Sequence, residues 1–230
     1  MFTKIIARAN SAPAGWTKNI FKKFFYKVII NLADDVLVNS KDFKTNFYKF
    51  FKIKTECIYN PFDKSIIFRN IKKKQSTFKK KKSLKIISIG RLTDQKDHLT
   101  LLKASKLINK KFNPEIIILG KGNNYKNLRN YIFENNLERN VKLLGYQKNP
   151  YVFLKSADIL VLTSKYEGLP NVLLEAQFLK KYVISTNCPT GPKEILMNGK
   201  AGDLIRIGDY KTLANLINNY KNKKKLISKK

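Results

Sequence analysis

The sequence predicts an α/β fold in which helices cover both faces of a parallel sheet. From residue 84 onward, short apolar runs of strand length alternate with amphipathic runs of helix length, as in parallel strands joined by crossover helices. Some apolar runs are unbroken, such as ILVL at residues 159–162, which is typical of strands buried on both faces. Polar turns follow these runs, at the strand ends where such sheets bind ligands.

The alternation places the elements of this sheet in order along the chain. We expect strands at residues 84–89, 115–119, 141–144, 158–162, 182–186 and 202–207. We expect helices at residues 97–110, 125–135, 151–155, 171–180, 192–197 and 210–222. The apolar residues of these segments recur with the periods of the two structures, which is the primary signal for assigning them.

Residues 1–62 do not form a complete domain in this interpretation. A helix is expected at residues 17–32 from apolar side chains spaced by three and four, and another at residues 42–51 after a Ser40 cap. Short strands are expected at residues 35–39 and 56–59. Residues 63–83 are polar, carry two lysine runs and show no period, so we expect a solvated basic linker.

The stretch at residues 157–179 carries the most chemical information. A buried strand, a turn with Glu167 and Gly168, and a helix opened by Pro170 follow one another there. Proline suits the first helical position. The free N–H groups of the helix and its dipole favour an anion. Glu175 lies about 7 Å beyond Pro170 at about 1.5 Å per residue. A phosphate flanked by two hydroxylated rings would fit between the two carboxylates.

A second group of candidates follows the first two strands of the sheet. The turn G-R-L-T-D-Q-K at residues 90–96 projects Arg91 and Lys96. Cations at a helix start are unfavourable without a bound anion, so we prefer a phosphate site to an ordinary basic turn. The G-K-G at residues 120–122 is either a tight turn or a ligand contact, because a lone G-x-G is weak evidence.

Several of these motifs resemble one enzyme family. E-G-L-P-N-V-L-L-E-A at residues 167–176 resembles the E-x7-E signature of retaining glycosyltransferases with the two-domain GT-B architecture, in particular family 4. The turn at residues 90–96 resembles that family's G-R-L-x-x-x-K, and residues 188–196 resemble its C-P-T-G-P-x-E-I-L variant. The run I-Y-N-P-F-D at residues 58–63 resembles its crossover between domains. The resemblance covers roughly residues 83–220 and, more weakly, residues 33–63.

The resemblance implies a domain organisation and a reaction. Residues 84–230 would form the Rossmann-like donor-binding domain, residues 1–62 a remnant of the acceptor domain and residues 63–83 the linker. Most of the family's acceptor domain has no counterpart before Met1. The implied reaction transfers a hexose or N-acetylhexosamine from a nucleotide sugar, with UDP favoured, to a glycan or lipid-linked acceptor of the cell envelope. It would retain the anomeric configuration and use no metal.

The resemblance also implies roles for residues. Glu167 would orient the donor sugar, Arg91 and Lys96 would stabilise the leaving diphosphate, and these three are the catalytic candidates. Glu175 would bind the ribose, and Tyr146 is either a contact to the base or an aromatic at the rim. The expected donor-binding set is Gly90, Arg91, Lys96, Tyr146, Glu167, Gly168, Leu169, Pro170, Asn171, Val172 and Glu175.

The remaining reactive residue types exclude several kinds of site. A single histidine, His98, excludes a multi-histidine metal site, and no D-x-D occurs, so we expect neither a metal nor a cofactor. We expect His98 to be a packing or capping residue at a helix start. Two cysteines imply no disulfide framework and fit a reducing compartment. Cys188 is expected as a small loop residue because no histidine is near it in sequence to activate it.

The formal net charge of +31 has two interpretations. We prefer compositional bias, because lysine occurs in every expected helix, and the alternative is an anionic partner, namely a nucleotide sugar, anionic lipid head groups or nucleic acid. No nucleic acid is expected, since the basic runs at residues 72–74, 79–82 and 223–225 lack interleaved aromatics. No apolar run has spanning length. We therefore expect a cytoplasmic protein, with peripheral contact at the inner face of the cell membrane as a further option.

Two other functions stay open at this point. The chain could be a catalytically incomplete nucleotide-sugar-binding fragment, or a subunit that needs a separate N-terminal half, because most of the acceptor domain lacks a counterpart. A nucleotide-dependent dehydrogenase is the weaker alternative, since the turn after the first strand does not supply G-x-G-x-x-G.

Overall fold

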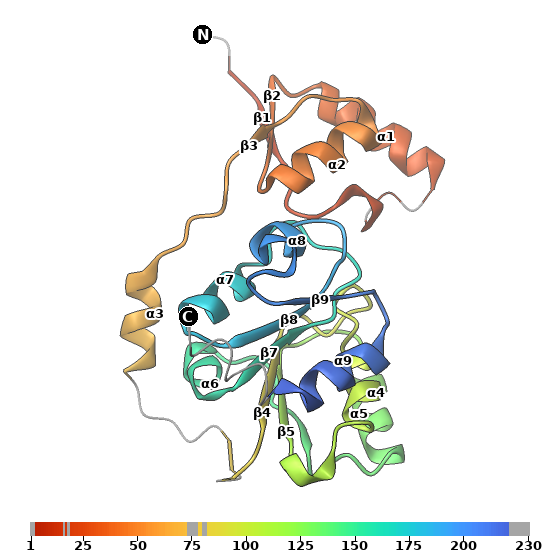
Figure 1. Ribbon diagram of the computed structural model, residues 1–230. Coiled ribbons are helices and arrows are strands. Elements are labelled where there is room, and N and C mark those ends of the chain that lie inside the picture. Colours follow the sequence, from red (N-terminus) through yellow and green to blue (C-terminus); the bar gives the residue numbers. More distant parts are fainter. Residues whose placement is uncertain (1–2, 16, 18, 73–77, 80–81, 221–230) are drawn as a thin grey trace.

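The computed structural model describes residues 3–15, 17, 19–72, 78–79 and 82–220, and in this part of the chain it contains two parallel sheets (Figure 1). The N-terminal unit holds a three-stranded sheet in the order β1-β2-β3. The C-terminal unit holds a six-stranded sheet in the order β6-β5-β4-β7-β8-β9. Every paired strand is parallel to its neighbour. The expected α/β fold class is therefore confirmed.

The N-terminal unit is small and has one modest core. Its elements are β1 (Ile6–Arg8), a 3-10 turn (Pro13–Gly15), α1 (Ile20–Asn31), β2 (Asp35–Val38), α2 (Lys41–Phe51) and β3 (Glu56–Cys57). The core combines Val36 and Val38 with three phenylalanines of α2, Phe43, Phe47 and Phe51. The hydroxyl of Ser40 accepts from the N–H of Phe43 at 3.1 Å, so the expected cap of α2 is confirmed.

The C-terminal unit follows the expected alternation closely. Its strands are β4 (Lys85–Ile89), β5 (Glu115–Leu119), β6 (Val141–Leu143), β7 (Ile159–Leu162), β8 (Tyr182–Thr186) and β9 (Asp203–Ile205). Its helices are α4 (His98–Ser105), α5 (Tyr125–Glu134), α6 (Tyr151–Ser156), α7 (Asn171–Phe178), α8 (Pro192–Ile195) and α9 (Tyr210–Asn218), with short 3-10 turns at Lys110–Phe112 and Met197–Gly199.

Alternate side chains of the six-stranded sheet enter two separate cores. Ile86 packs with the helices α4, α5 and α9 on one face, whereas Ile87 packs with α6 and α7 on the other. This alternation follows from the two-residue period of a strand. Fully burying one such aliphatic side chain contributes about 1.5–3 kcal/mol. The unbroken apolar runs that predicted the sheet are thus explained by burial on both of its faces.

The segment expected as a linker without a period contains a helix, which the sequence pattern did not predict. Helix α3 (Lys64–Ile71) begins after Asp63, whose carboxylate accepts from the N–H of Ser65 at 2.8 Å. The ring of Phe68 lies 5.2 Å from that of Phe178 on α7, so α3 runs along the C-terminal unit (Figure 1). The basic runs at residues 72–74 and 79–82 lie largely outside the described residues, and the run at 223–225 lies wholly outside them.

Helix α1 begins later than expected and has an unusual surface. Its cap is Asn19, whose side chain accepts from the N–H of Lys22 at 2.8 Å. None of its residues is buried, although its sequence is strongly apolar. Among the residues that the structure describes, no helix has both the length and the apolar character needed to cross a bilayer.

Candidate functional site

The strand order of the C-terminal sheet fixes where a ligand would bind. From β4 the chain winds outward to β5 and β6, then returns to β7 and winds outward in the other direction. The loops after β4 and β7, which are adjacent strands, therefore lead to opposite sides and leave a crevice between them. The sequence motifs with Arg91 and Lys96 follow β4, and the motif with Glu167 follows β7.

Lys96 and Glu167 meet at this crevice. The Nζ atom of Lys96 lies 2.5 Å from Oε1 of Glu167, and the hydroxyl of Ser164 donates to the same oxygen at 2.5 Å. Their side chains are only 15% and 8% exposed. Buried charges need such partners. The sequence assigned Lys96 to a phosphate and Glu167 to a sugar, but did not predict that the two form an ion pair with each other.

Gln95 joins the two loops from the side of Arg91. Its side-chain amide nitrogen donates to the backbone carbonyl of Tyr166 at 2.9 Å, and its backbone carbonyl oxygen accepts from the N–H of Lys165 at 2.7 Å. The guanidinium of Arg91 contacts the side-chain oxygen of Gln95 at 3.3 Å. Arg91 is exposed, so both expected cations lie on the same side as Glu167. Gln95 was not among the predicted site residues.

The glycines at residues 120–122 serve loop packing. A Cβ atom on Gly120 would lie 1.9 Å from the carbonyl oxygen of Gly90, and one on Gly122 would lie 2.3 Å from that of Leu92. The loop after β5 therefore lies directly against the loop after β4. The structure explains both glycines by close packing of the two loops, and a ligand contact at this place stays a prediction.

The turn at Glu167 also contacts the N-terminal unit. The N–H of Ala12 donates to the carbonyl of Glu167 at 2.7 Å, and a Cβ atom on Gly168 would lie 2.2 Å from the carbonyl oxygen of Asn10. The backbone of the N-terminal unit thus occupies the space beside Gly168 where a side chain would stand. The place of Gly168 in the donor-binding set stays a prediction.

Helix α7 presents its N-terminus at the same place. The sequence suggested Pro170 as the first helical residue, but the structure places it at the N-cap. No side chain caps the helix. The amide of Asn60 donates to Oδ1 of Asn171 at 2.9 Å, and the guanidinium of Arg8 donates to Oδ1 of Asn60 at 2.9 Å. A third cation, from the N-terminal unit, thus approaches this helix. No local sequence signal indicates this contact.

Of the other predicted residues at the start of α7, Leu169 is buried, and Val172 packs partly against the core beside α6. Any contact of these two residues with a ligand is therefore through their backbone groups. Gly90 lies against the side chain of Lys96, with 3.3 Å between its Cβ position and Cδ of that lysine.

Glu175 and Tyr146 mark the far part of the crevice. The hydroxyl of Tyr151 donates to Oε1 of Glu175 at 3.3 Å, and burial raises the pKa of this carboxyl despite that bond. Tyr151 is thus the hydrogen-bond partner of this partly buried carboxylate. Tyr146 is 65% exposed, which is compatible with either of its two predicted roles.

Glu194 holds the two units together. Its carboxylate accepts from the N–H groups of Lys41 and Asp42, at 3.3 and 2.9 Å, and from the hydroxyl of Tyr59. The two N–H groups belong to the first turn of α2, where a negative charge is favourable. The bond to Glu194 raises the pKa of Tyr59 to about 12. The sequence identified the motif around Glu194 but not this contact.

His98 and Cys188 take the positions expected for packing residues. Burial lowers the pKa of His98 to about 4, and its Nδ1 atom lies 3.2 Å from the hydroxyl of Ser88. Burial and the charge of Glu167 raise the pKa of Cys188 to about 12. At neutral pH the histidine is uncharged and the cysteine is a thiol. Within the described residues, no three histidine, cysteine or acidic side chains gather as a metal site.

The sequence of this chain matches a known protein family. A family model described as "Glycosyl transferases group 1" matches residues 69–229. The chain belongs to this family. The match includes both loops of the crevice and the whole six-stranded sheet.

Individual relatives are considerably longer than this chain. The uncharacterized glycosyltransferase MJ1059 of Methanocaldococcus jannaschii is 41% identical over 84% of this chain and 50% of its own length. An N-acetylgalactosamine-N,N'-diacetylbacillosaminyl-diphospho-undecaprenol 4-alpha-N-acetylgalactosaminyltransferase of Campylobacter jejuni is 30% identical over 89% of this chain and 57% of its own length. The chain thus spans about half the length of the curated relatives it matches.

Solved structures share the fold. Anabaena Alr3699/HepE in complex with UDP-glucose superposes with a TM-score of 0.78 at 22% identity, covering 94% of this chain and 62% of that protein. TarM of S. aureus superposes with a TM-score of 0.75 at 23% identity, covering 94% of this chain and 44% of that protein. The α/β architecture of this group 1 glycosyltransferase domain, N-terminal unit included, recurs in these proteins.

Proposed function

We propose that this group 1 glycosyltransferase chain is a retaining, metal-independent transferase of family 4. It would transfer a hexose or N-acetylhexosamine from a nucleotide sugar, with UDP favoured, to a glycan or lipid-linked acceptor of the cell envelope. The observation that carries the proposal is the Lys96–Glu167 pair beside the N-terminus of α7, which has no side-chain cap. Cation, carboxylate and free amides are thereby brought to one end of the sheet.

This arrangement suits a diphosphate leaving group. In the proposed reaction an acceptor hydroxyl oxygen bonds to the anomeric carbon, the bond from that carbon to the donor phosphate oxygen breaks, and the nucleoside diphosphate departs with the hydroxyl proton on its phosphate oxygen. Negative charge then builds on the phosphate, where fixed cations and N–H dipoles lower the barrier most effectively. Lys96 has three N–H donors, so it can hold Glu167 and a phosphate oxygen together. Arg91 and the amides of Asn171 and Val172 would complete the diphosphate site.

The two carboxylates would bind the sugars on either side of the diphosphate. Glu167, held by Ser164 and Lys96, would accept hydrogen bonds from hydroxyls of the donor sugar. Glu175, held by Tyr151, would accept from the ribose, with Tyr146 at the base. These roles, the E-x7-E assignment and the division at residues 62 and 83 stay proposals.

The relatives support the chemical class of the substrates. The Campylobacter jejuni relative is named for a diphospho-undecaprenol-linked acceptor, and the Anabaena structure contains UDP-glucose. We propose a cytoplasmic location with peripheral contact at the inner face of the cell membrane, and no nucleic-acid partner. The net charge of +31 supports an anionic surface as a partner.

The test is titration of the purified chain with UDP by calorimetry, after a thermal-shift screen of UDP-, GDP- and ADP-sugars. Saturable binding is expected, and Lys96→Ala and Glu175→Ala should each weaken it at least about tenfold, as loss of a charged hydrogen-bond partner does. Lys103→Ala, at an exposed lysine of α4, is the matched control and should bind normally. The proposal fails if no nucleotide binds saturably or if both site variants bind as the control does.

A second proposal is that the chain is a catalytically incomplete nucleotide-sugar-binding fragment, or a subunit that needs a separate N-terminal half. The coverage of only about half of each relative supports it. Release of UDP from UDP-sugar in the presence of a lipid-linked acceptor separates the two proposals. Transfer by the chain alone would rule out the second proposal, whereas nucleotide binding without any transfer would favour it.

A further inference from the structure

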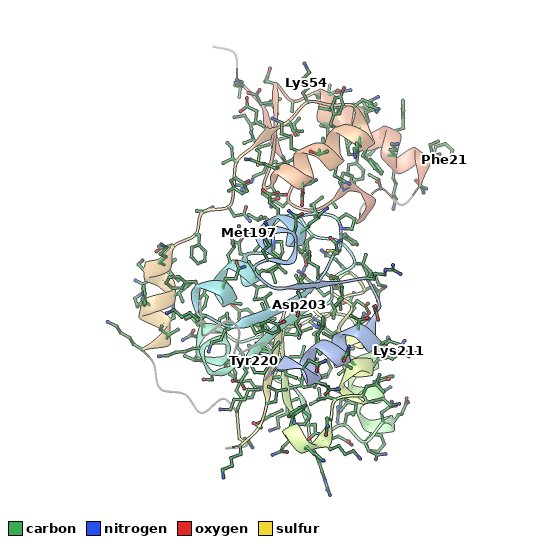
Figure 2. The ribbon with its side chains drawn as sticks, viewed as in Figure 1. Phe21, Lys54, Met197, Asp203, Lys211 and Tyr220 are labelled. Atoms are coloured by element: carbon green, nitrogen blue, oxygen red, sulfur yellow. The ribbon has the colours of Figure 1, made fainter. Side chains whose placement is uncertain are left out.

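Helix α1 exposes a stripe of large apolar side chains that the proposed reaction does not use. Tyr26 and Ile30 face the small core of the N-terminal unit. Figure 2 shows Phe21 at the outer end of α1, pointing away from both sheets. The exposed stripe consists of Ile20 (76% exposed), Phe21 (81%), Phe24 (70%), Phe25 (61%), Val28 (45%), Ile29 (44%) and Leu32 (71%).

The geometry of the helix shows which neighbours could cover this stripe. With 3.6 residues per turn, Phe21 lies opposite Ile30, and Val28 lies opposite Tyr26. The stripe is therefore centred on the side that faces directly away from the unit's own core. A further helix in the same layer of the N-terminal unit would pack against a flank of α1, and would leave Phe21 and Val28 uncovered. An extended planar surface would cover the whole stripe.

The charges beside the stripe indicate the nature of that surface. The helix sequence IFKKFFYKVIIN contains three lysines and no acidic residue. Lys22 lies at one edge of the stripe, and Lys23 and Lys27 lie toward the other, by the same helical spacing. All three are exposed, and the ammonium of Lys23 stands 4.5 Å from the ring centre of Phe50. Apolar side chains flanked by Lys22 on one side and by Lys23 and Lys27 on the other match a bilayer with anionic head groups.

We propose that α1 docks this protein on an anionic phospholipid bilayer. The helix would lie parallel to the membrane surface, with Phe21, Phe24 and Val28 inserted at the level of the head groups, where aromatic rings are favoured. Lys22 and Lys27 would contact lipid phosphates. Because α1 is already folded against α2 and the small sheet, binding does not have to order it. The docking rests on the membrane contact proposed above and assigns it to α1, but it does not depend on nucleotide binding or transfer, so the docking and the transferase proposal can fail separately.

Co-sedimentation of the full chain with vesicles tests the aromatic stripe. The wild-type chain should bind vesicles of phosphatidylcholine mixed with phosphatidylglycerol. The variant F21S/F24S should bind them at least about tenfold more weakly, because two inserted rings are lost. The matched control is F133S, at an isolated phenylalanine of α5 that is 72% exposed, and it should bind as the wild type does. Circular dichroism spectra and urea denaturation midpoints that match in all three show that they are folded.

A second arm tests the lysines beside the stripe. K22E/K27E should lose the preference for phosphatidylglycerol over pure phosphatidylcholine vesicles, whereas K103E/K126E, with the same change of charge on exposed positions of α4 and α5, should keep most of it. Equal binding by F21S/F24S and the wild type would overturn the proposal, because total charge would then suffice. Ultracentrifugation tests whether α1 instead binds a second copy of the chain. The proposal is also overturned if the wild type does not bind vesicles but self-associates, while F21S/F24S stays monomeric.

Discussion

The N-terminal and C-terminal units use the same strand–helix–strand pattern but bury it very differently. In the C-terminal unit, successive residues such as Ile86 and Ile87 enter cores on opposite faces of the sheet, and both are completely buried. In the N-terminal unit a few residues of β2 and α2 form the only described core, and α1 turns its apolar side outward. Apolar periodicity therefore identifies an apolar face in both units, but only the tertiary structure shows whether that face is covered by protein.

The largest expected effect is a difference in the free energy of unfolding between truncation of a buried side chain in the C-terminal unit and truncation of an exposed one in α1. Leu173→Ala in α7 should lower the free energy of unfolding by about 2–5 kcal/mol, because it leaves a cavity beside β7. Phe21→Ala should change it by less than about 0.5 kcal/mol, since Phe21 is 81% exposed. Urea denaturation of both variants measures the difference. Similar losses in the two variants would mean that α1 packs on protein in solution.

The second effect concerns a buried titratable group of the C-terminal unit. His98 has a pKa of about 4 in the folded chain, below its ordinary value of 6.5, because burial disfavours the charged ring. The unfolded chain therefore binds more protons between these values. The contribution of uncharged His98 to the free energy of unfolding is fully present above pH 6.5. It is lost as the pH falls toward 4, by up to about 3 kcal/mol.

The measurement compares urea denaturation of the wild type and His98→Gln at several pH values. Both chains lose stability from their carboxylates, so the difference between the two curves isolates the histidine. The wild type should lose more stability than His98→Gln on acidification. Parallel curves would show that the ring is hydrated in the folded protein.

The smallest effect concerns the contact between the two units. Glu194→Ala should cost about 1 kcal/mol, since it removes the carboxylate at the first turn of α2. The loss should appear as faster hydrogen exchange in α2, with the core strands β5 and β8 unchanged. Glu138→Ala, at an exposed carboxylate, is the matched control and should exchange as the wild type does. Equal exchange in α2 for both variants would mean that the units are held by other contacts.

Sequence patterns predicted the C-terminal unit well and the N-terminal unit less well. The bounds of β5 and β8 match the expected strands residue for residue, because their apolar runs end at clear turns. Strand β1 was not expected, since three residues cannot display a period. Helix α3 was expected as part of a linker because two lysine runs follow it, although its own sequence, KSIIFRNI, is half apolar. Its position depends on the contact of Phe68 with Phe178, which no local pattern reveals.

The candidate site also contains residues that the sequence predicted and residues that it did not. Arg91, Lys96, Glu167 and Glu175 lie in short motifs at strand ends, so their gathering at one edge of the sheet follows from the sequence. Their partners do not. Ser164, Gln95 and Tyr151 are ordinary polar residues without a distinctive spacing, and their roles depend on side-chain directions that only a folded chain defines.

By itself the sequence determined the parallel sheet, the end of it that carries the charged motifs, and the resemblance to a glycosyltransferase family. These follow from periodicity and from residue order along single strands and turns. The tertiary structure decided that Lys96 pairs with Glu167, that Asn10 fills the space at Gly168, and that α1 leaves its aromatic residues uncovered. Each of these depends on segments far apart in the chain, whose distance in space is set by packing and not by sequence separation.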